Sequence, residues 1–155
     1  MAYRNPASTE HKIVEGDCCC GGPCPYDCSE CCAAYTLTWT NPQDWLEPRV
    51  TPLTLNRSNC SWHASRYVDW DNGNGYLFHQ AGIRCENDED GKAQWILWMH
   101  VSASDWNVGG WMNWQGEEVI GSGQCPPDSA NATLPPDPIS NPNDYNAEVS
   151  ITCND

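Results

Sequence analysis

The stretch Gly82–Val101, GIRCENDEDGKAQWILWMHV, has the pattern of a β-hairpin. Two runs of strand-forming residues, Gly82–Cys85 and Ala93–Val101, flank the acidic segment ENDEDGK. A short polar segment with a glycine between two such runs is typical of an antiparallel turn. Residues 94–99, QWILWM, are apolar on both faces, which predicts a central strand. This hairpin indicates a β protein.

Other segments repeat the pattern. YTLTWT, residues 35–40, alternates large residues with threonines and predicts a half-buried strand. VTPLTL, residues 50–55, has a proline in its middle and is predicted to be an edge strand at best. Pro126–Pro142 is rich in proline and lacks periodicity, which predicts a long loop. Further strands are expected at 60–68, 75–79, 82–85, 93–101, 111–120 and 145–153.

Roughly eight short strands separated by turn residues predict an all-β fold, an antiparallel β-sandwich or jelly roll. A chain of 155 residues is long enough for one such domain. Its composition divides it into three segments. Residues 1–17 are expected to be a flexible N-terminal arm, residues 18–32 a cysteine-rich segment, and residues 33–155 the β-sandwich domain.

The charge of the chain limits its partners. Seven Lys and Arg residues stand against twenty-one Asp and Glu residues, which gives a formal charge of −14. Nucleic acid is therefore not an expected partner, because phosphate binding needs a basic surface. No segment is apolar and long enough to cross a membrane, so no membrane partner is expected either.

The segment CCCGGPCPYDCSECC, residues 18–32, holds seven of the eleven cysteines. Such a density is typical of domains stapled by disulfides in an oxidising compartment. Because eleven is an odd number, at least one cysteine stays reduced or bonds to a neighbouring subunit. This points to protein subunits of a larger assembly, or a homo-oligomer, as partners. The disulfide candidates are Cys18, Cys19, Cys20, Cys24, Cys28, Cys31, Cys32, Cys60, Cys85, Cys125 and Cys153.

Metal binding is the alternative for this segment. A zinc-stapled intracellular protein would use four thiolates, although the spacing here is irregular outside Cys28-Ser-Glu-Cys31. Calcium could bind the oxygen ligands of residues 69–74, DWDNGN, but the Asn-Gly pairs there favour a hairpin turn. The candidate zinc ligands are Cys20, Cys24, Cys28 and Cys31.

The sequence contains no recognisable catalytic motif. Its four histidines occur one per segment, and none belongs to a zinc-protease or nucleophile-elbow pattern. His63, His79 and His100 fall in strand patterns and are expected on the sheet surface. A pair of carboxylates brought together by the fold stays open, because separation in sequence does not give distance in space. The sequence therefore favours a protein that is not an enzyme, with no catalytic residue assigned.

Tryptophan is unusually frequent, with nine Trp against one Phe. Trp39 and Trp62 lie on expected strands and are predicted to fill the core in place of Phe, as is Trp95, with Trp98 as a further core candidate. The glycine-flanked stretch DWNVGGWMNWQGEE fits this explanation less well. Exposed rings there could stack on sugars, so a carbohydrate-binding module with a glycan ligand is one alternative. The rings of this candidate platform are Trp106, Trp111 and Trp114.

Several of these segments together are similar to known domains. The cysteine cluster, the strands YTLTW and CSWHA, the hairpin GIRCE–GKAQWILWMHV and the final AEVSIT resemble small cysteine-rich β-domains of tailed-phage structural proteins and bacterial surface proteins. The resemblance covers residues 28–153. It implies a virion or surface component and carries over no catalytic residue.

The sequence thus favours a structural virion or surface protein, such as a capsid decoration, tail or fibre component. The N-terminus lacks the apolar run of a signal peptide. Release by lysis, followed by disulfide formation outside the cell, reconciles that N-terminus with the cysteine content. The expected location is therefore the virion or the extracellular space.

Overall fold

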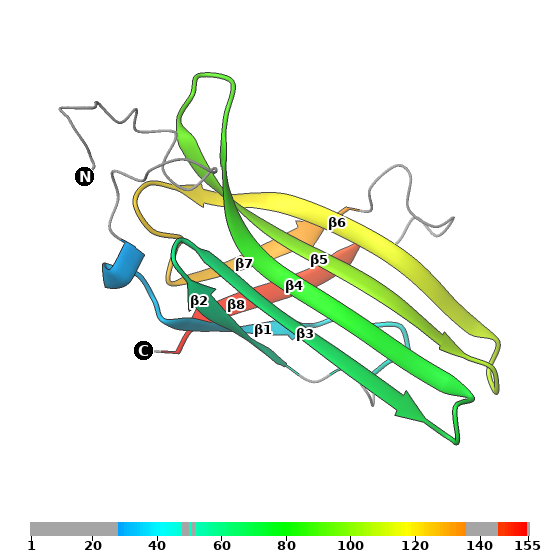
Figure 1. The fold of residues 1–155 in the computed structure, drawn as a ribbon. Coiled ribbons are helices and arrows are strands. Elements are labelled where there is room, and N and C mark those ends of the chain that lie inside the picture. Colours follow the sequence, from blue (N-terminus) through cyan, green and yellow to red (C-terminus); the bar gives the residue numbers. More distant parts are fainter. Residues whose placement is uncertain (1–27, 48–49, 51, 136–145, 155) are drawn as a thin grey trace.

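The structure is a computed structural model of the chain and describes residues 28–47, 50, 52–135 and 146–154. All strand pairs in it are antiparallel, so the predicted all-β class is confirmed. The elements in chain order (Figure 1) are η2 (Cys28–Glu30), β1 (Ala34–Trp39), β2 (Leu53–Ser58), β3 (Ser61–Trp70), β4 (Gly75–Asn87), β5 (Ala93–Asp105), β6 (Gly110–Ser122), β7 (Ser129–Leu134) and β8 (Ala147–Cys153).

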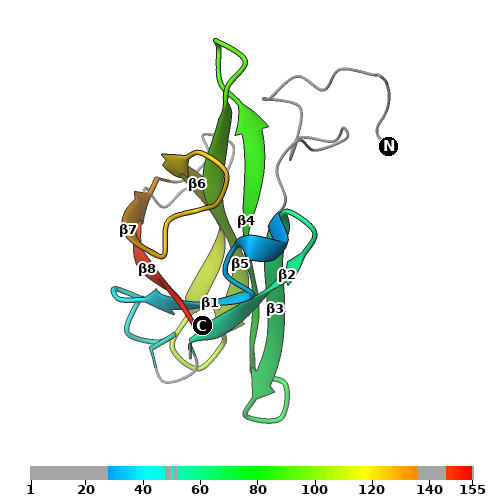
Figure 2. The same cartoon turned by 90° about the vertical axis from the view of Figure 1, so that its left-hand side faces the viewer.

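The eight strands belong to one sheet with the order β6-β5-β4-β3-β2-β1-β8-β7. From β1 to β6 each strand pairs with the next, which makes an up-and-down meander. β8 then pairs with β1, so the sheet curls back and nearly closes into a barrel (Figure 2). In Figure 1, β3 to β6 form one wall in front of a second wall made by β1, β8 and β7. The two layers expected of a sandwich are therefore walls of a single sheet.

The barrel has a seam between β6 and β7, which contact each other without pairing in the sheet. Gly116 of β6 lies at this contact. A Cβ atom there would collide with the carbonyl oxygen of Pro135, the residue that follows β7. The close approach of the two strands therefore depends on glycine at this position.

The core is built from the inward positions of the strands. Tyr35, Leu37 and Trp39 of β1 are buried, as their alternation with threonines predicts. Trp62 packs edge-to-face against Tyr35 and Trp95, with ring centroids 5.7 Å apart in both pairs. Such pairs attract each other beyond the area they bury. Tryptophan thus fills the core in place of phenylalanine, as expected.

One predicted loop contains a strand. β7 lies within the proline-rich segment 126–142 and pairs with β8 along its whole length. Its sequence, SANATL, has small inward residues and no large β-former, so its alternation is weak in the sequence. The strand is stabilised by its hydrogen bonds to β8 and by the packing of Leu134 in the core, although its local β propensity is low.

Two other strand predictions change. β2 is not an edge strand, because it lies between β1 and β3. Pro52 precedes the strand and so removes no hydrogen bond from its ladder. The predicted strands 75–79 and 82–85 are one continuous strand, β4, because Gln80 and Ala81 stay paired with β3 and β5.

Some expectations fall on residues that are not described. The predicted arm, residues 1–17, and the first part of the cysteine-rich segment lie outside the described residues. Among the residues that are described, no helix has the length and apolar character needed to span a membrane.

Candidate functional site

Three disulfides gather at one end of the barrel, where η2 also lies (Figure 2). They tie residues 28–32, here called the disulfide cap, to the β2–β3 turn, to the segment after β6 and to the end of β8. Disulfides persist in oxidising surroundings, so the cap indicates an extracellular or otherwise oxidising environment. The bonds are Cys28–Cys60, Cys31–Cys125 and Cys32–Cys153.

These bonds confirm six of the disulfide candidates and correct the zinc alternative. The sulfur atoms of Cys28 and Cys31 are bonded to other cysteines, so they cannot be thiolate ligands. Within the described part of the chain, no three His, Cys, Asp or Glu residues are grouped as a metal site. Cys85 is buried and takes part in none of the three bonds. The remaining candidates lie outside the described residues: Cys18, Cys19, Cys20 and Cys24.

Core aromatic side chains hold the same end of the barrel by hydrogen bonds. The indole Nε1 of Trp62 donates to the carbonyl oxygen of Cys32 at 2.8 Å. The hydroxyl of Tyr35 donates to the carbonyl of Pro127 at 3.0 Å, and Nε1 of Trp95 donates to that of Gly123 at 3.0 Å. Each bond satisfies a carbonyl in a segment outside the regular strands. The cap is therefore attached to the core by hydrogen bonds as well as by sulfur.

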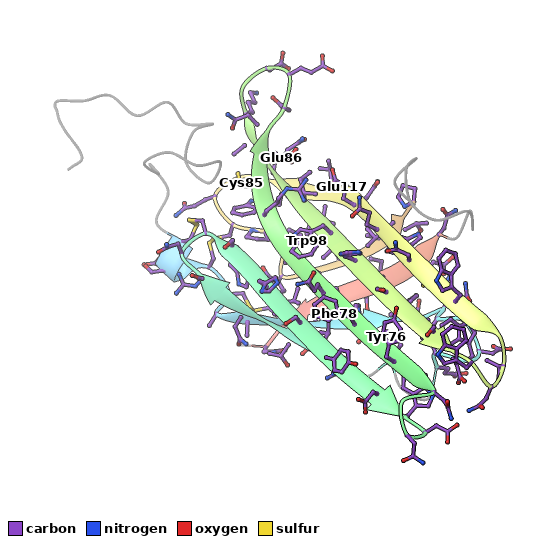
Figure 3. The ribbon with its side chains drawn as sticks, turned by 45° about the vertical axis from the view of Figure 1, so that its right-hand side comes forward. Tyr76, Phe78, Cys85, Glu86, Trp98 and Glu117 are labelled. Carbon is purple, nitrogen blue, oxygen red and sulfur yellow. A yellow bond between two sulfur atoms is a disulfide. The ribbon has the colours of Figure 1, made fainter. Side chains whose placement is uncertain are left out.

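The solvent side of the wall formed by β3 to β6 carries a second feature, here called the aromatic face (Figure 3). Its outward positions place aromatic rings among amides, hydroxyls and imidazoles. Rings of this kind pack on the C–H faces of sugars, and the polar groups can exchange hydrogen bonds with sugar hydroxyls. The face consists of His63, Ser65, Tyr67, Tyr76, Phe78, Gln80, Trp98, His100, Ser102, Trp111, Asn113 and Gln115.

The cross-strand register sets the order of these side chains. Tyr67 of β3 lies opposite Phe78 of β4, which in turn lies opposite Ser102 of β5. Tyr67 is 64% exposed, so the middle of the face presents a ring to solvent. Figure 3 shows Tyr76, Phe78 and Trp98 following one another along the wall. The rings thus form a line along the strand direction.

Trp98, a core candidate in the sequence, lies instead on the solvent side of the sheet, where it reaches across a neighbouring strand that has a glycine at the facing position. A Cβ atom on Gly82 would come within 2.7 Å of two atoms of the Trp98 indole. Beyond the glycine, the indole stacks on the imidazole of His63, with centroids 5.7 Å apart and planes 26° apart. Trp98 therefore covers backbone that would otherwise be bare, and it links β5 to β3 on the outside of the sheet.

Hydroxyl groups accompany the rings at the other end of the face. The Tyr76 hydroxyl lies 3.2 Å from Oγ of Ser102. Ser104 sits between Tyr76 and Trp111 in the register and is buried beneath its neighbours. Its Oγ has no hydrogen-bond partner among the described residues. A buried hydroxyl without a partner is costly, because burial removes its hydrogen bonds to water.

The aromatic face differs from the rest of the molecule in charge. None of its side chains is a carboxylate, ammonium or guanidinium group, although the chain carries a formal charge of −14. Charged groups begin where the face ends. Asp69 pairs in register with Tyr76 at one end, and Glu117 pairs with Trp98 at the other. Arg84 bonds to Glu117 at 2.8 Å and to Glu86 at 2.6 Å, so this boundary is a small ion cluster.

The structure separates the three predicted platform rings. Trp106 is 75% exposed in the β5–β6 turn, and Trp111 is 54% exposed at the start of β6. Trp114 points inward and is 2% exposed, so it belongs to the core and not to a platform. The reason is alternation: Trp111 and Trp114 are three residues apart on one strand, so they face opposite sides of the sheet.

The candidate calcium segment, residues 69–74, comprises the last two residues of β3 and the β3–β4 turn that the Asn-Gly pairs favoured. It bonds to the neighbouring β5–β6 turn. The amide of Trp106 donates to the carbonyl of Asn74 at 2.8 Å, and the Asn107 side-chain amide donates to the Asp71 carboxylate. The polar side chains of this turn therefore serve to hold two hairpin ends together.

His79, expected on the sheet surface, is instead fully buried. Its ring packs against Trp39 with centroids 5.7 Å apart, and neither ring nitrogen has a hydrogen-bond partner among the described residues. Burial, and then the charge of Arg66 on the adjacent strand, lower the pKa of His79 from 6.5 to about 4. His63 and His100 lie on the aromatic face, on the opposite side of the sheet from His79.

Acid is expected to destabilise the fold through His79. The pKa is about 4 in the folded protein against an ordinary 6.5, so the unfolded chain binds the proton more tightly. The contribution of neutral His79 to the free energy of unfolding is complete at neutral pH. It falls by about 3 kcal/mol as the pH drops from 6.5 to about 4. When the His79→Leu variant is unfolded with urea at about pH 7 and at about pH 4.5, its free energy of unfolding should not show this fall in acid. The exposed His63→Leu should retain it; an unchanged acid loss in His79→Leu would contradict the prediction.

The aromatic face was missed in the sequence, although a signal for it exists. Tyr76 and Phe78 are two residues apart on one strand, so they share a face opposite to Leu77 and His79. Each strand alone looks like a buried strand with aromatic residues on both sides. The face becomes recognisable when the register places Tyr67 beside Phe78.

No protein-family model matches the chain, and neither a search of curated proteins nor a search of solved structures found a match. The resemblance to phage and bacterial surface domains therefore stays an expectation, and a proposal of function depends on the geometry of the molecule.

Proposed function

We propose that this protein is a non-catalytic surface or structural component that attaches to carbohydrate through its aromatic face. A virion is one such surface. The single observation that carries the proposal is the composition of the face: five aromatic rings and seven other polar side chains, none of them a carboxylate, lysine or arginine, on four adjacent strands of a strongly acidic chain. A face of this kind suits a ligand that offers both C–H surface and hydroxyl groups.

The disulfide cap supports the proposal that the protein works on a surface in an oxidising environment. Three long-range disulfides make the fold resistant to unfolding in an oxidising environment, where a surface component works. The cap lies at one end of the barrel, whereas the aromatic face runs along a wall. The residues that stabilise the fold and those proposed to bind are thus separate, so the two roles can be tested independently.

Binding is tested with Tyr67→Ala. Because Tyr67 is 64% exposed, its removal should leave the fold intact. Affinity for the glycan that gives the strongest signal on a glycan array should fall about tenfold, which corresponds to about 1.4 kcal/mol. Thr152→Ala, at an exposed position on β8 in the opposite wall, is the matched control and should bind as the wild type does. Glycan binding that is unchanged in Tyr67→Ala and in Phe78→Ala would remove the aromatic face from the proposal.

The virion setting has its own test. Mass spectrometry of purified particles should detect the chain at a fixed ratio to the other particle proteins. Absence of the chain from particles, together with its presence on a cell surface or in the medium, would leave carbohydrate attachment in place and discard the virion.

A further inference from the structure

We infer that the ligand is an uncharged polysaccharide, and that an internal segment of it lies along the strands of the aromatic face, from Trp111 at one end to Trp98 at the other. The inference rests on the proposed function and adds to it the charge, length and direction of the ligand.

The length follows from the register. Trp98 lies opposite Gly82, which is six residues beyond Tyr76 on β4. At a rise of about 3.4 Å per residue, the rings at the two ends of the face are about 20 Å apart. This span exceeds a single sugar ring. Phe78 and Gln80 occupy the positions between, so the polar and aromatic composition continues along the whole distance.

The charge follows from the boundaries. A polysaccharide with carboxylates or sulfates would meet Asp69 at one end and the Glu86 and Glu117 carboxylates at the other. The negative electrostatic potential of a protein with a formal charge of −14 would repel such a polysaccharide as well. Like charges repel, and the Arg84 guanidinium at the second boundary is already bonded to Glu86 and Glu117. A neutral chain avoids this cost and still satisfies the amides and hydroxyls.

The openness of the face favours an internal segment over a chain end. Tyr67 and Trp111 are 64% and 54% exposed, so their rings stand on the surface of a sheet. Along the strand direction the face is bounded by Asp69 at one end and by the Arg84 ion cluster at the other. A chain that lies on these rings would run along the strands and extend past both boundaries.

Ser104 occupies the register position between Tyr76 and Trp111, and its buried hydroxyl has no partner among the described residues. A ligand hydroxyl that reached this position would satisfy it. Ser104→Ala removes this hydroxyl without removing a ring. The variant should weaken the longest oligosaccharides and leave the fold unchanged, since it deletes a buried polar atom that has no partner.

The experiment is calorimetry with the neutral polysaccharide that binds best on an array, supplied as oligosaccharides of increasing length, and with an anionic derivative of the same polysaccharide. Affinity should rise with length and then level off once the face is covered. It should not change between about 0.1 M and 1 M salt, because no charge pairing is involved. Trp111→Ala and His63→Ala, at opposite ends of the face, should each weaken the long oligosaccharides at least about threefold and abolish the gain from added length.

The outcomes separate the inference from the proposed function. Equal affinity for a monosaccharide and a long oligosaccharide, or tighter binding of the anionic derivative, would overturn the inference and leave carbohydrate attachment standing. Absence of binding to every glycan would overturn the proposed function itself. A dimer in light scattering that is lost in Tyr67→Ala would show that a second copy of the chain covers the face, and would also overturn both.

Discussion

Replacing Cys32 and Cys153 together with alanine is expected to lower the free energy of unfolding by about 3–5 kcal/mol. The bond joins residues that are 121 apart in sequence, and with Cys31–Cys125 already closed it ties off a further loop of about 30 residues in the unfolded chain. Denaturant unfolding of the oxidised variant and wild type measures the loss. Replacing both cysteines avoids leaving one reactive thiol behind.

Two comparisons make this prediction specific. Removing the Cys28–Cys60 bond, with a separation of 32, should cost about as much, because the loop it closes is of similar length. A reductant should lower the melting temperature of the wild type, whereas a chelator should leave it unchanged. The reverse result, with sensitivity to the chelator alone, would show that metal and not sulfur holds the cap.

Trp62→Ala is expected to be the most damaging single substitution in the core, at about 3–5 kcal/mol. Trp62 is 1% exposed, and its ring contacts Tyr35 and Trp95 at the centre of the aromatic cluster. Its Nε1 also satisfies the carbonyl of Cys32. The substitution therefore creates a cavity and leaves a buried carbonyl without its partner, beside the disulfide cap.

The matched control for this variant is Trp106→Ala. It removes the same side chain from a position that is 75% exposed, so the free energy of unfolding should change by less than about 0.5 kcal/mol. Trp62→Phe separates the two causes, since it fills most of the cavity and still removes the hydrogen bond. Comparable losses in Trp62→Ala and Trp106→Ala would mean that the aromatic cluster does not stabilise the fold.

Much of the fold could be predicted because the strands follow local rules. The alternation in β1 and the turn between β4 and β5 identify strands and hairpins without tertiary information. β7 could not be found in this way, because its residues are small and its pairing partner is β8. Closure into one curled sheet could not be predicted from the sequence either, because it depends on which distant strands pair.

The candidate site shows the same limit. That the cysteine-rich segment is stapled to the sheet could be expected from composition, but the partners of Cys31 and Cys32 could not, because eleven cysteines allow many pairings. Trp114 was expected on the surface because the sequence does not show which alternate residues of β6 point into the core. His79 was expected at the surface, and only the register shows that it follows Leu77 into the core.

The pairing of β8 with β1 has a consequence for biosynthesis. Among the described strands, β8 is synthesised last and lies against β1, which is synthesised first, and this closure brings Cys153 to Cys32. An emerging chain can build the meander from β1 to β6 as each hairpin is completed, yet it cannot close the sheet until β8 has left the ribosome. Formation of the Cys32–Cys153 bond therefore waits for synthesis of β8, and a chain that stops before Cys153 leaves the Cys32 thiol exposed to mispairing.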